Sequence, residues 1–258
     1  MKLVNNALLY FRATIFWIGF ALSTALAGLL TPFLLPFSQE TSYKVLRPWT
    51  NFNVWWLKVT CGVKYKVLGR ENIDLSRNGI VLANHQSTWE TLIIPVLFPP
   101  ISWVLKKELF KIPFFGWALS RVKPIAIDRT AGNSAIDQVK QNGKERLDEG
   151  NWVCIFPEGT RVKPGHTERY RMGGALLAEY CAKNSADGKG YPIYPLAHNA
   201  GECWPRHSYI KQPGTITVSI GQPFTVEDLD PGEINDKVRT WIEAEIEKMP
   251  AAVVDNNK

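Results

Sequence analysis

One stretch of the chain decides the fold, and it reads Ile80-Val81-Leu82-Ala83-Asn84-His85-Gln86-Ser87-Thr88-Trp89-Glu90. Its first four residues are apolar and partly β-branched, which is typical of a short buried strand. The polar residues after them lead into a helix that we expect to begin at Thr88. In open α/β sheets a ligand or a reacting group often lies where a strand ends and a helix begins. The stretch therefore predicts an α/β fold with a site at the carboxyl edge of its sheet.

Strand-like and helix-like segments alternate on both sides of this stretch. The expected strands are Val63–Leu68, Gly79–Ala83, Ser102–Leu105, Lys123–Ile127, Trp152–Phe156, Tyr191–Ala197 and Gly214–Ile220. The expected helices are Thr88–Leu97, Asn133–Leu147, Met172–Cys181 and Glu227–Lys248. This alternation indicates a mixed α/β domain whose mostly buried sheet is flanked by helices. We place the domain at residues 63–250 and expect a flexible tail at 251–258.

His85 stands at the end of a predicted strand, and Glu90 follows five residues later. Histidine acts as a general base near neutral pH, and a carboxylate on its second ring nitrogen fixes the tautomer. Five residues on a regular helix lie about 140° apart, so a contact requires His85 to precede the helix and Glu90 to sit in its first turn. A second interpretation is a capping box, in which Glu90 bonds the backbone of Ser87. The two interpretations are compatible.

A second polar cluster follows another predicted strand and reads Phe156-Pro157-Glu158-Gly159-Thr160-Arg161. Gly159 permits a tight turn. The amides of such a turn, with the Thr160 hydroxyl and the Arg161 guanidinium, can grip a phosphate, and Glu158 can orient Arg161. The alternative is a polar loop with a surface ion pair. Because this cluster and His85 both follow strands, we expect one cleft at a shared edge of the sheet.

Two further cations also follow predicted strands. Lys106 comes directly after Ser102–Leu105, and Arg129 comes shortly after Lys123–Ile127. Arg129 either adds a phosphate contact or is a surface charge beside Asp128.

The start of the chain is apolar. No charged residue occurs from Ala13 to Ser38, a length that can span a bilayer. Three interpretations compete: a signal peptide, a transmembrane helix, and a hairpin that dips into one leaflet. Pro32 and Pro36 end or bend the first helix, and the tryptophans and lysines of Tyr43–Val63 suit a second helix at the interface. We expect residues 1–62 to form a two-helix membrane anchor, and the sequence leaves open whether it crosses fully.

The composition is that of a folded chain, which excludes a disordered or collagen-like protein. The 258 residues include 30 Lys and Arg against 24 Asp and Glu, a formal net charge of +6. This excess favours anionic partners, namely lipid phosphates, phosphorylated metabolites or nucleic acid. Nucleic acid is the weakest of these candidates, because the basic residues form no stripe and because nucleic-acid binding does not explain the apolar start of the chain. The four cysteines lack C-x-x-C spacing, which argues against a zinc ribbon or a thioredoxin-type motif. We expect all four to be reduced in a cytosol-facing domain, and with the histidines they form no metal-ligand set.

Together these segments resemble the glycerolipid acyltransferase family, and within it the bacterial 1-acyl-glycerol-3-phosphate acyltransferases. Asn84–Glu90 is similar to the N-H-x-x-x-x-D box of that family, and Phe156–Arg161 is similar to its F-P-E-G-T-R box. Ile127-Asp128-Arg129 and Tyr191-Pro192-Ile193-Tyr194-Pro195 resemble two less specific boxes. The order and spacing agree over roughly residues 64–225. The sequence departs from the family at Glu90, where the usual residue is Asp, and this leaves the exact acceptor open.

The resemblance implies a reaction and its residues. His85 is expected to deprotonate the free hydroxyl of 1-acyl-glycerol-3-phosphate as that hydroxyl attacks a thioester, with Glu90 holding His85 in the required tautomer. The phosphate of the acceptor is expected to bind to Arg161, Gly159, Thr160, Glu158, Lys106 and Arg129.

The resemblance also implies the other participants and the location. Acyl-CoA or acyl carrier protein is the implied co-substrate, without a cofactor, a metal or a covalent enzyme intermediate. The expected partners are a lysophospholipid acceptor and an anionic membrane, with no nucleic acid. The expected location is the inner membrane, with the active site facing the cytoplasm. Two alternatives are an acyltransferase for another lyso-lipid, such as lyso-ornithine lipid, and a membrane-anchored protein that binds lysophospholipids without catalysis.

Overall fold

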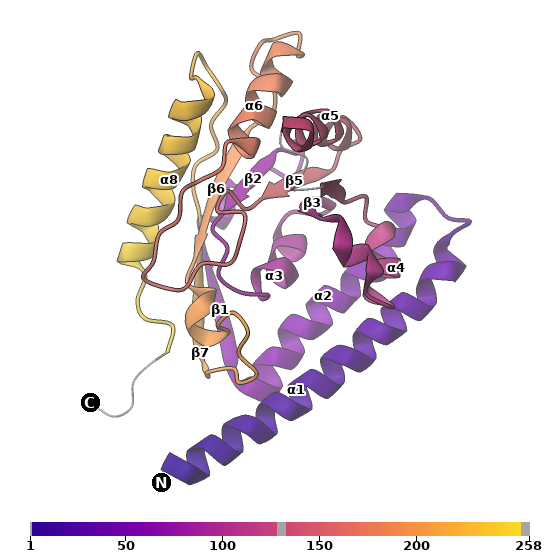
Figure 1. Ribbon diagram of the computed structural model, residues 1–258, viewed down its shortest axis with the longest axis vertical. Helices are drawn as coiled ribbons and strands as arrows, with labels where there is room; N and C mark the ends of the chain where they lie inside the picture. Colours follow the sequence, from indigo (N-terminus) through magenta and orange to yellow (C-terminus); the bar gives the residue numbers. More distant parts are fainter. Residues whose placement is uncertain (1, 128–132, 254–258) are drawn as a thin grey trace.

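The computed structural model describes residues 2–127 and 133–253, and its centre is a seven-stranded sheet (Figure 1). The strands are β1 (Val63–Leu68), β2 (Ile80–Ala83), β3 (Ile101–Lys106), β4 (Ile125–Ile127), β5 (Trp152–Ile155), β6 (Ile193–His198) and β7 (Gly214–Ile220). Their order across the sheet is β1-β7-β6-β2-β5-β3-β4. The β6–β7 pair is antiparallel, and the other neighbours are parallel. The predicted fold class, a mixed and mostly buried sheet between helices, is confirmed.

Three neighbouring strands at the centre of the sheet, β6, β2 and β5, are buried along their whole length. Ile80 pairs with Ile193 on one side and with Val153 on the other. These pairs run in parallel, so all three strands end at the same edge of the sheet. The residues that follow β2 and β5 and those at the end of β6 therefore come together there.

Helices cover both faces of the sheet because alternate side chains of each strand point to opposite sides. The helices that follow β1 along the chain are α3 (Glu90–Leu97), α4 (Phe115–Ser120), α5 (Asn133–Asp148), α6 (Gly173–Lys183), α7 (Ala200–Cys203) and α8 (Pro231–Lys248). Ile80 and Leu82 share a core cluster with residues of α5, α6 and α8. Val81 and Ala83 share the opposite cluster with residues of α3 and of the N-terminal helices.

The N-terminal region is a pair of helices, α1 (Lys2–Leu30) and α2 (Gln39–Cys61), joined through the 3₁₀ turn η1 (Thr31–Leu34). They lie side by side beneath the sheet domain (Figure 1). Pro32 lies in η1, and the Ser38 hydroxyl caps α2 by accepting the amide of Thr41. The two-helix arrangement was predicted from the prolines. The helices also enter the main core, because Phe16 and Leu57 are fully buried in it.

The outer surface of this helix pair is apolar. Leu22 is 67% exposed and Phe33 is 74% exposed, and other large apolar side chains of α1 are exposed in the same way. By length and composition Asn6–Leu34 is able to cross a membrane, a property that core helices and signal sequences share.

Several predicted boundaries are shifted. Helix α3 begins at Glu90 rather than Thr88, and α8 begins at Pro231 rather than Glu227. Asp230 and Glu233 form a capping box that starts α8 there, whereas Glu227 has a positive φ of 35°. In the predicted tail, Ala252 is buried, and its carbonyl accepts the amide of Thr215 at 2.8 Å. Residues 254–258 lie outside the described part of the chain.

Candidate active site

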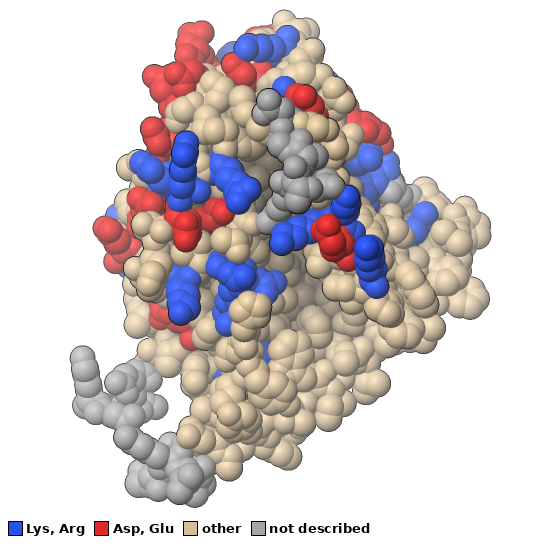
Figure 2. Space-filling model, viewed as in Figure 1, with Lys and Arg blue, Asp and Glu red and all other residues tan. Residues whose placement is uncertain are grey.

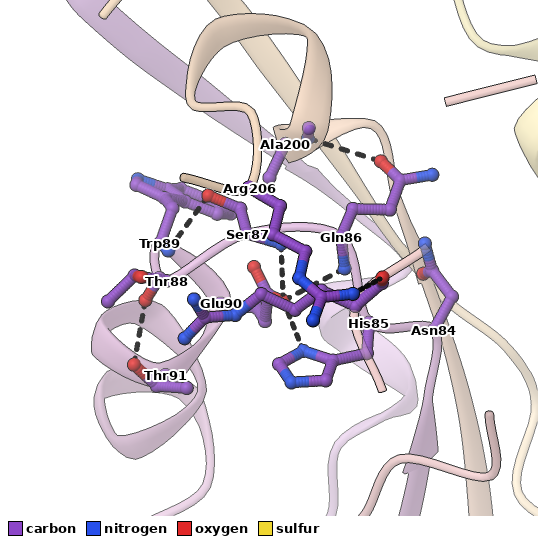
Figure 3. Close-up of polar contacts among 12 residues, drawn as sticks. Asn84, His85, Gln86, Ser87, Thr88, Trp89, Glu90, Thr91, Ala200 and Arg206 are labelled. Atoms are coloured by element: carbon purple, nitrogen blue, oxygen red, sulfur yellow. Dashed lines mark hydrogen bonds and ion pairs between the residues drawn. The ribbon is translucent and has the colours of Figure 1, made fainter. Parts of the chain in front are cut away.

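The imidazole of His85 and the carboxylate of Glu90 are in direct contact (Figure 3). His85 lies in the turn after β2, and Glu90 is the first residue of α3, so the side chain of Glu90 folds back beneath the turn. The distance from Nδ1 of His85 to Oε1 of Glu90 is 2.7 Å. This is the arrangement that the five-residue spacing required: a histidine before the helix and an acid in its first turn.

The same oxygen of Glu90 also accepts two backbone amides. Gln86 N lies 3.0 Å from Oε1 and Ser87 N lies 2.8 Å from it. Burial raises the pKa of Glu90, but the imidazoles of His198 and His85 and the amide of Ser87 outweigh burial and hold that pKa below its ordinary value. An ionised Oε1 only accepts, so Nδ1 of His85 carries the proton and Nε2 carries the lone pair.

Half of the predicted capping box is present. The amide of Ser87 donates to Glu90 as expected, but the hydroxyl of Ser87 accepts the amide of Trp89 at 3.1 Å instead of completing the box at Glu90. The carboxylate of Glu90 thus orders the turn and holds the imidazole at the same time.

A second, fully buried histidine lies behind Glu90. Nε2 of His198, at the end of β6, is 3.9 Å from Oε2 of Glu90 and 2.8 Å from the carbonyl oxygen of Asn84. The amide of Ala200 donates to Nδ1 of His198, so Nε2 carries the proton. Burial lowers the pKa of His198 and favours its neutral form. The side chain of Asn84 bonds both the backbone amide and the carbonyl of His198, which ties the ends of β2 and β6 together.

The imidazole of His85 is fixed by stacking as well as by hydrogen bonding. Its ring lies 4.0 Å from that of Phe156 with an interplanar angle of 11°, and Phe156 stacks in turn on Trp103. The side chain of His85 is 17% exposed. Within the described residues no hydrogen bond is made by its Nε2. One nitrogen is therefore held by the protein, and the other is free to take a proton from a ligand.

The loop after β5 closes against the His85 turn. The carboxylate of Glu158 accepts the backbone amide of His85 at 3.0 Å, and the carbonyl of His85 accepts the amide of Val162 at 2.8 Å. Gly159 turns this loop with a φ of 68°, and a Cβ there would lie 2.6 Å from Nε of Arg171. The two sequence clusters thus form one site, as their positions after β2 and β5 predicted.

Glu158 supports the histidine turn rather than Arg161. Burial raises the pKa of Glu158 to about 8. Both residues are described, and no hydrogen bond or ion pair within 4.0 Å joins Glu158 to Arg161, so the expected orienting contact is not seen. An ionised carboxylate would also repel a phosphate, because both groups carry negative charge.

The guanidinium of Arg161 lies near the dyad without an acidic partner within 4.0 Å in the described part of the chain. Burial lowers its pKa, the charge of Glu90 opposes that shift, and the nearby guanidinium of Arg206 adds to it. The hydroxyl of Thr160 is exposed at the same loop. A half-buried guanidinium beside another cation is suited to bind an anion.

Comparisons with known proteins show which family this chain is related to. The family model described as "Acyltransferase" matches residues 64–199. The 1-acyl-sn-glycerol-3-phosphate acyltransferase of Pseudomonas aeruginosa is 40% identical over 237 residues, which are 90% of this chain and 88% of that protein. The chain belongs to the acyltransferase family. The enzyme of that name from Saccharomyces cerevisiae is 29% identical over 71% of this chain and 60% of its own length.

The fold is also shared with a solved structure. The crystal structure of PlsC, the 1-acyl-sn-glycerophosphate acyltransferase of Thermotoga maritima, matches with a TM-score of 0.76. The match covers 99% of this chain and 100% of that chain at 23% identity. At this identity the likeness establishes that this acyltransferase shares the fold of PlsC.

One predicted phosphate-binding residue, Lys106, stands apart from the contacts described so far. Lys106 is exposed at the carboxyl end of β3, and no hydrogen bond or ion pair joins it to His85, Arg161 or Glu158, all of which are described. Arg129 lies outside the described residues. Their parts in the acyltransferase site stay predictions.

Sequence reasoning missed two residues that touch this site. Arg206 lies 45 residues from the loop that it contacts, and its Nη1 donates to the hydroxyl of Thr160 and the carbonyl of Arg161. The sequence analysis assigns no role to His198, although this residue closely follows Tyr191–Pro195, the segment that resembles one of the less specific boxes of the family. No local pattern reveals Arg206, whereas the position of His198 at the end of a predicted central strand, as with His85, was a usable signal.

Proposed function

We propose that this acyltransferase moves a fatty acyl group from a thioester to the free hydroxyl of 1-acyl-sn-glycerol-3-phosphate and so makes phosphatidic acid. The donor is acyl-CoA or acyl carrier protein. The observation that carries the proposal is the 2.7 Å contact between His85 and Glu90, which leaves Nε2 of His85 as a free proton acceptor. The names of the relatives from Pseudomonas and Saccharomyces support the acceptor.

In this proposal, Nε2 of His85 takes the proton of the acceptor hydroxyl as its oxygen attacks the thioester carbonyl carbon. The C–S bond then breaks, and the imidazolium passes that proton to the departing thiolate. The ionised carboxylate of Glu90 favours the imidazolium while it exists. Phe156 keeps the ring in plane, and Glu158 holds the backbone of His85. Glu90 and Phe156 thus hold the imidazole of His85, Glu158 holds its backbone, and the imidazole acts on the substrate.

We assign the acceptor phosphate to Arg161, with the hydroxyl of Thr160 and the turn at Gly159 beside it. The half-buried guanidinium has no protein carboxylate within 4.0 Å among the described residues, so a phosphate dianion would supply its missing partner. Lys106 and Arg129 remain candidates for additional phosphate contacts.

We also propose that the enzyme works at the cytoplasmic surface of the inner membrane. The acceptor and the product are anionic amphiphiles, and the exposed apolar surface of α1 and η1 gives the chain a means of reaching them. Flotation with vesicles containing anionic lipid, and protease protection in inverted membrane vesicles, test this assignment. Failure to float would contradict it.

The decisive experiment supplies the purified protein with acyl-CoA or acyl carrier protein and a panel of lyso-lipid acceptors. Thiol release and mass spectrometry of the products are measured together. We expect phosphatidic acid, and loss of a general base in His85→Ala should lower turnover by about 10² or more. The substitution Glu71→Gln, on an exposed turn, serves as a folded control. Transfer only to another lyso-lipid would reassign the acceptor, and binding without thiol release from any donor would refute catalysis.

A further inference from the structure

An open pocket of about 510 Å³ lies on the outer side of the loop that carries Arg161. Its lining includes Lys163, Pro164, His166, Gly201, Pro205 and Arg206. This volume falls within the range of small-molecule sites. The residues come from the loop after β5 and from α7 with the segment that follows it, so the pocket is built where two distant parts of the chain meet.

The pocket shares a wall with the active site. Nη1 of Arg206 lies 3.3 Å from the hydroxyl of Thr160 and 3.1 Å from the carbonyl of Arg161. The amide of Gly201 donates to the side chain of Gln86, the residue after His85, at 3.1 Å. A ligand in the pocket would therefore touch the loop that carries Arg161 and would also lie against Gly201, whose amide contacts the His85 turn.

The charge of the pocket is basic, and its walls are apolar. Lys163, His166 and Arg206 contribute the basic groups, while two prolines form flat walls. Within the described residues neither Lys163 nor Arg206 has a carboxylate within 4.0 Å. The one acid of the lining, Glu202, already accepts the amide of Ala252 through Oε2 at 2.7 Å. Figure 2 shows one face of the molecule, on which Lys and Arg side chains lie around a central hollow with Asp and Glu side chains among them.

The two arginines of this region divide into an inner and an outer cation. Arg161 is half-buried and interacts electrostatically with Glu90, whereas Arg206 is exposed and lines the pocket. The proposed reaction brings together two substrates that each carry phosphate, the acceptor and the donor. If Arg161 takes the acceptor phosphate, the outer basic pocket is left for the donor.

We propose that this pocket binds the phosphate-bearing pantetheine arm of the thioester donor. Both acyl-CoA and acyl carrier protein present the acyl group on 4′-phosphopantetheine, a chain with apolar and amide segments that ends in a phosphate. The proline walls suit the chain, and Arg206 with Lys163 suits its phosphate. This inference rests on the proposed function and adds to it the place where the donor is held.

The test compares two donors that differ only in the phosphate, acyl-4′-phosphopantetheine and acyl-pantetheine. Wild-type enzyme should use the phosphorylated donor with a KM lower by about tenfold or more, as expected for a charge-assisted hydrogen bond. Arg206→Ala should remove most of that preference and change the KM for lysophosphatidic acid less than the KM for the phosphorylated donor. The exposed Arg70 supplies a matched control, Arg70→Ala, which should behave as wild type.

A second variant separates binding from folding. Arg206 tethers the active-site loop, so its loss can disturb the fold, whereas Lys163 makes no side-chain hydrogen bond within the described residues. Lys163→Ala should weaken the phosphate preference with an unchanged melting temperature. Equal use of both donors by the wild type, or an Arg206→Ala effect on the acceptor KM alone, would overturn the inference.

Two further results show which phosphate of the donor is bound, and whether a negative result refutes the donor pocket or the proposed function. An Arg206→Ala effect on acyl-CoA that is absent with acyl carrier protein would overturn the shared arm, because only the nucleotide phosphates would then be bound. Equal effects on both donors would support it. Absence of transfer from every donor in the wild type would refute the proposed function itself, whereas transfer without a phosphate preference would refute only the donor pocket.

Discussion

Replacement of Glu90 by Gln tests the part of the mechanism on which the other parts depend. The amide has nearly the shape of the carboxylate, and its oxygen can still accept the amides of Gln86 and Ser87. That leaves the new NH₂ group in the place of Oε2, facing the Nε2–H of His198 at 3.9 Å. The turn is preserved in outline, while the negative charge beside His85 is lost.

The size of the effect follows from that lost charge. A hydrogen bond to a charged group is worth about 1.5–3 kcal/mol. Unit charges about 4 Å apart interact by about 4 kcal/mol at an effective dielectric constant of about 20. Since about 1.36 kcal/mol corresponds to a tenfold change in rate, we expect kcat to fall by roughly 10- to 10³-fold. The KM for either substrate should change little, because Glu90 is fully buried and touches neither.

The assay is thiol release followed with a thiol-reactive dye, with phosphatidic acid quantified by mass spectrometry. The four cysteines of the protein are free and buried, so the folded enzyme should react slowly with the dye. Glu71→Gln makes the same chemical change at an exposed position and should keep full activity. A folded Glu90→Gln enzyme within threefold of wild-type kcat would refute the reasoning.

Two further predictions concern the loop after β5. Burial raises the pKa of Glu158 to about 8 in the folded chain. Between its ordinary pKa and that value, Glu158 is deprotonated in the unfolded chain but keeps its proton in the folded chain. The free energy of unfolding therefore falls as pH rises through this window. Melting temperatures from pH 5 to 8.5 should therefore fall more for the wild type than for Glu158→Gln, and parallel curves would contradict this. Arg161→Ala should raise the KM for lysophosphatidic acid by about tenfold or more, as loss of a charge-assisted bond predicts, while Arg70→Ala should not; an unchanged acceptor KM would remove the phosphate assignment.

The sheet was predictable because its strands are short apolar runs bounded by Gly, Pro or Asn. The limits of β1 and β7 agree with prediction, and those of the other strands differ by one or two residues at one or both ends. The predicted start of α8 was too early because Glu227 lies in an acidic stretch that has helical propensity. In the structure Glu227 and Asp228 have positive φ angles, and the helix begins only at Pro231. There the capping pair Asp230 and Glu233 outweighs the propensity of the residues before it.

The site divides into a local part and a part made by distant contacts. His85 and Glu90 are five residues apart, so the geometry of one turn decides their contact. Arg206 reaches Thr160 across 46 positions, and the stack of His85 on Phe156 joins two strands. Contacts of this second kind depend on which strands are neighbours, and the order in which β2 lies between β6 and β5 is not written in any single segment.

A single carboxylate oxygen connects the fold of this acyltransferase to its proposed chemistry. Oε1 of Glu90 accepts the amides of Gln86 and Ser87 and the ring proton of His85, so the turn and the dyad are built on one atom. The capping and catalytic interpretations of the spacing were therefore inseparable in the sequence. The extra methylene of Glu, where the family usually has Asp, is accommodated because the side chain folds back from the first residue of α3. A shorter side chain at this position would have to shift the turn toward the helix to keep all three donors, and the ring of His85 would move with it across the face of Phe156.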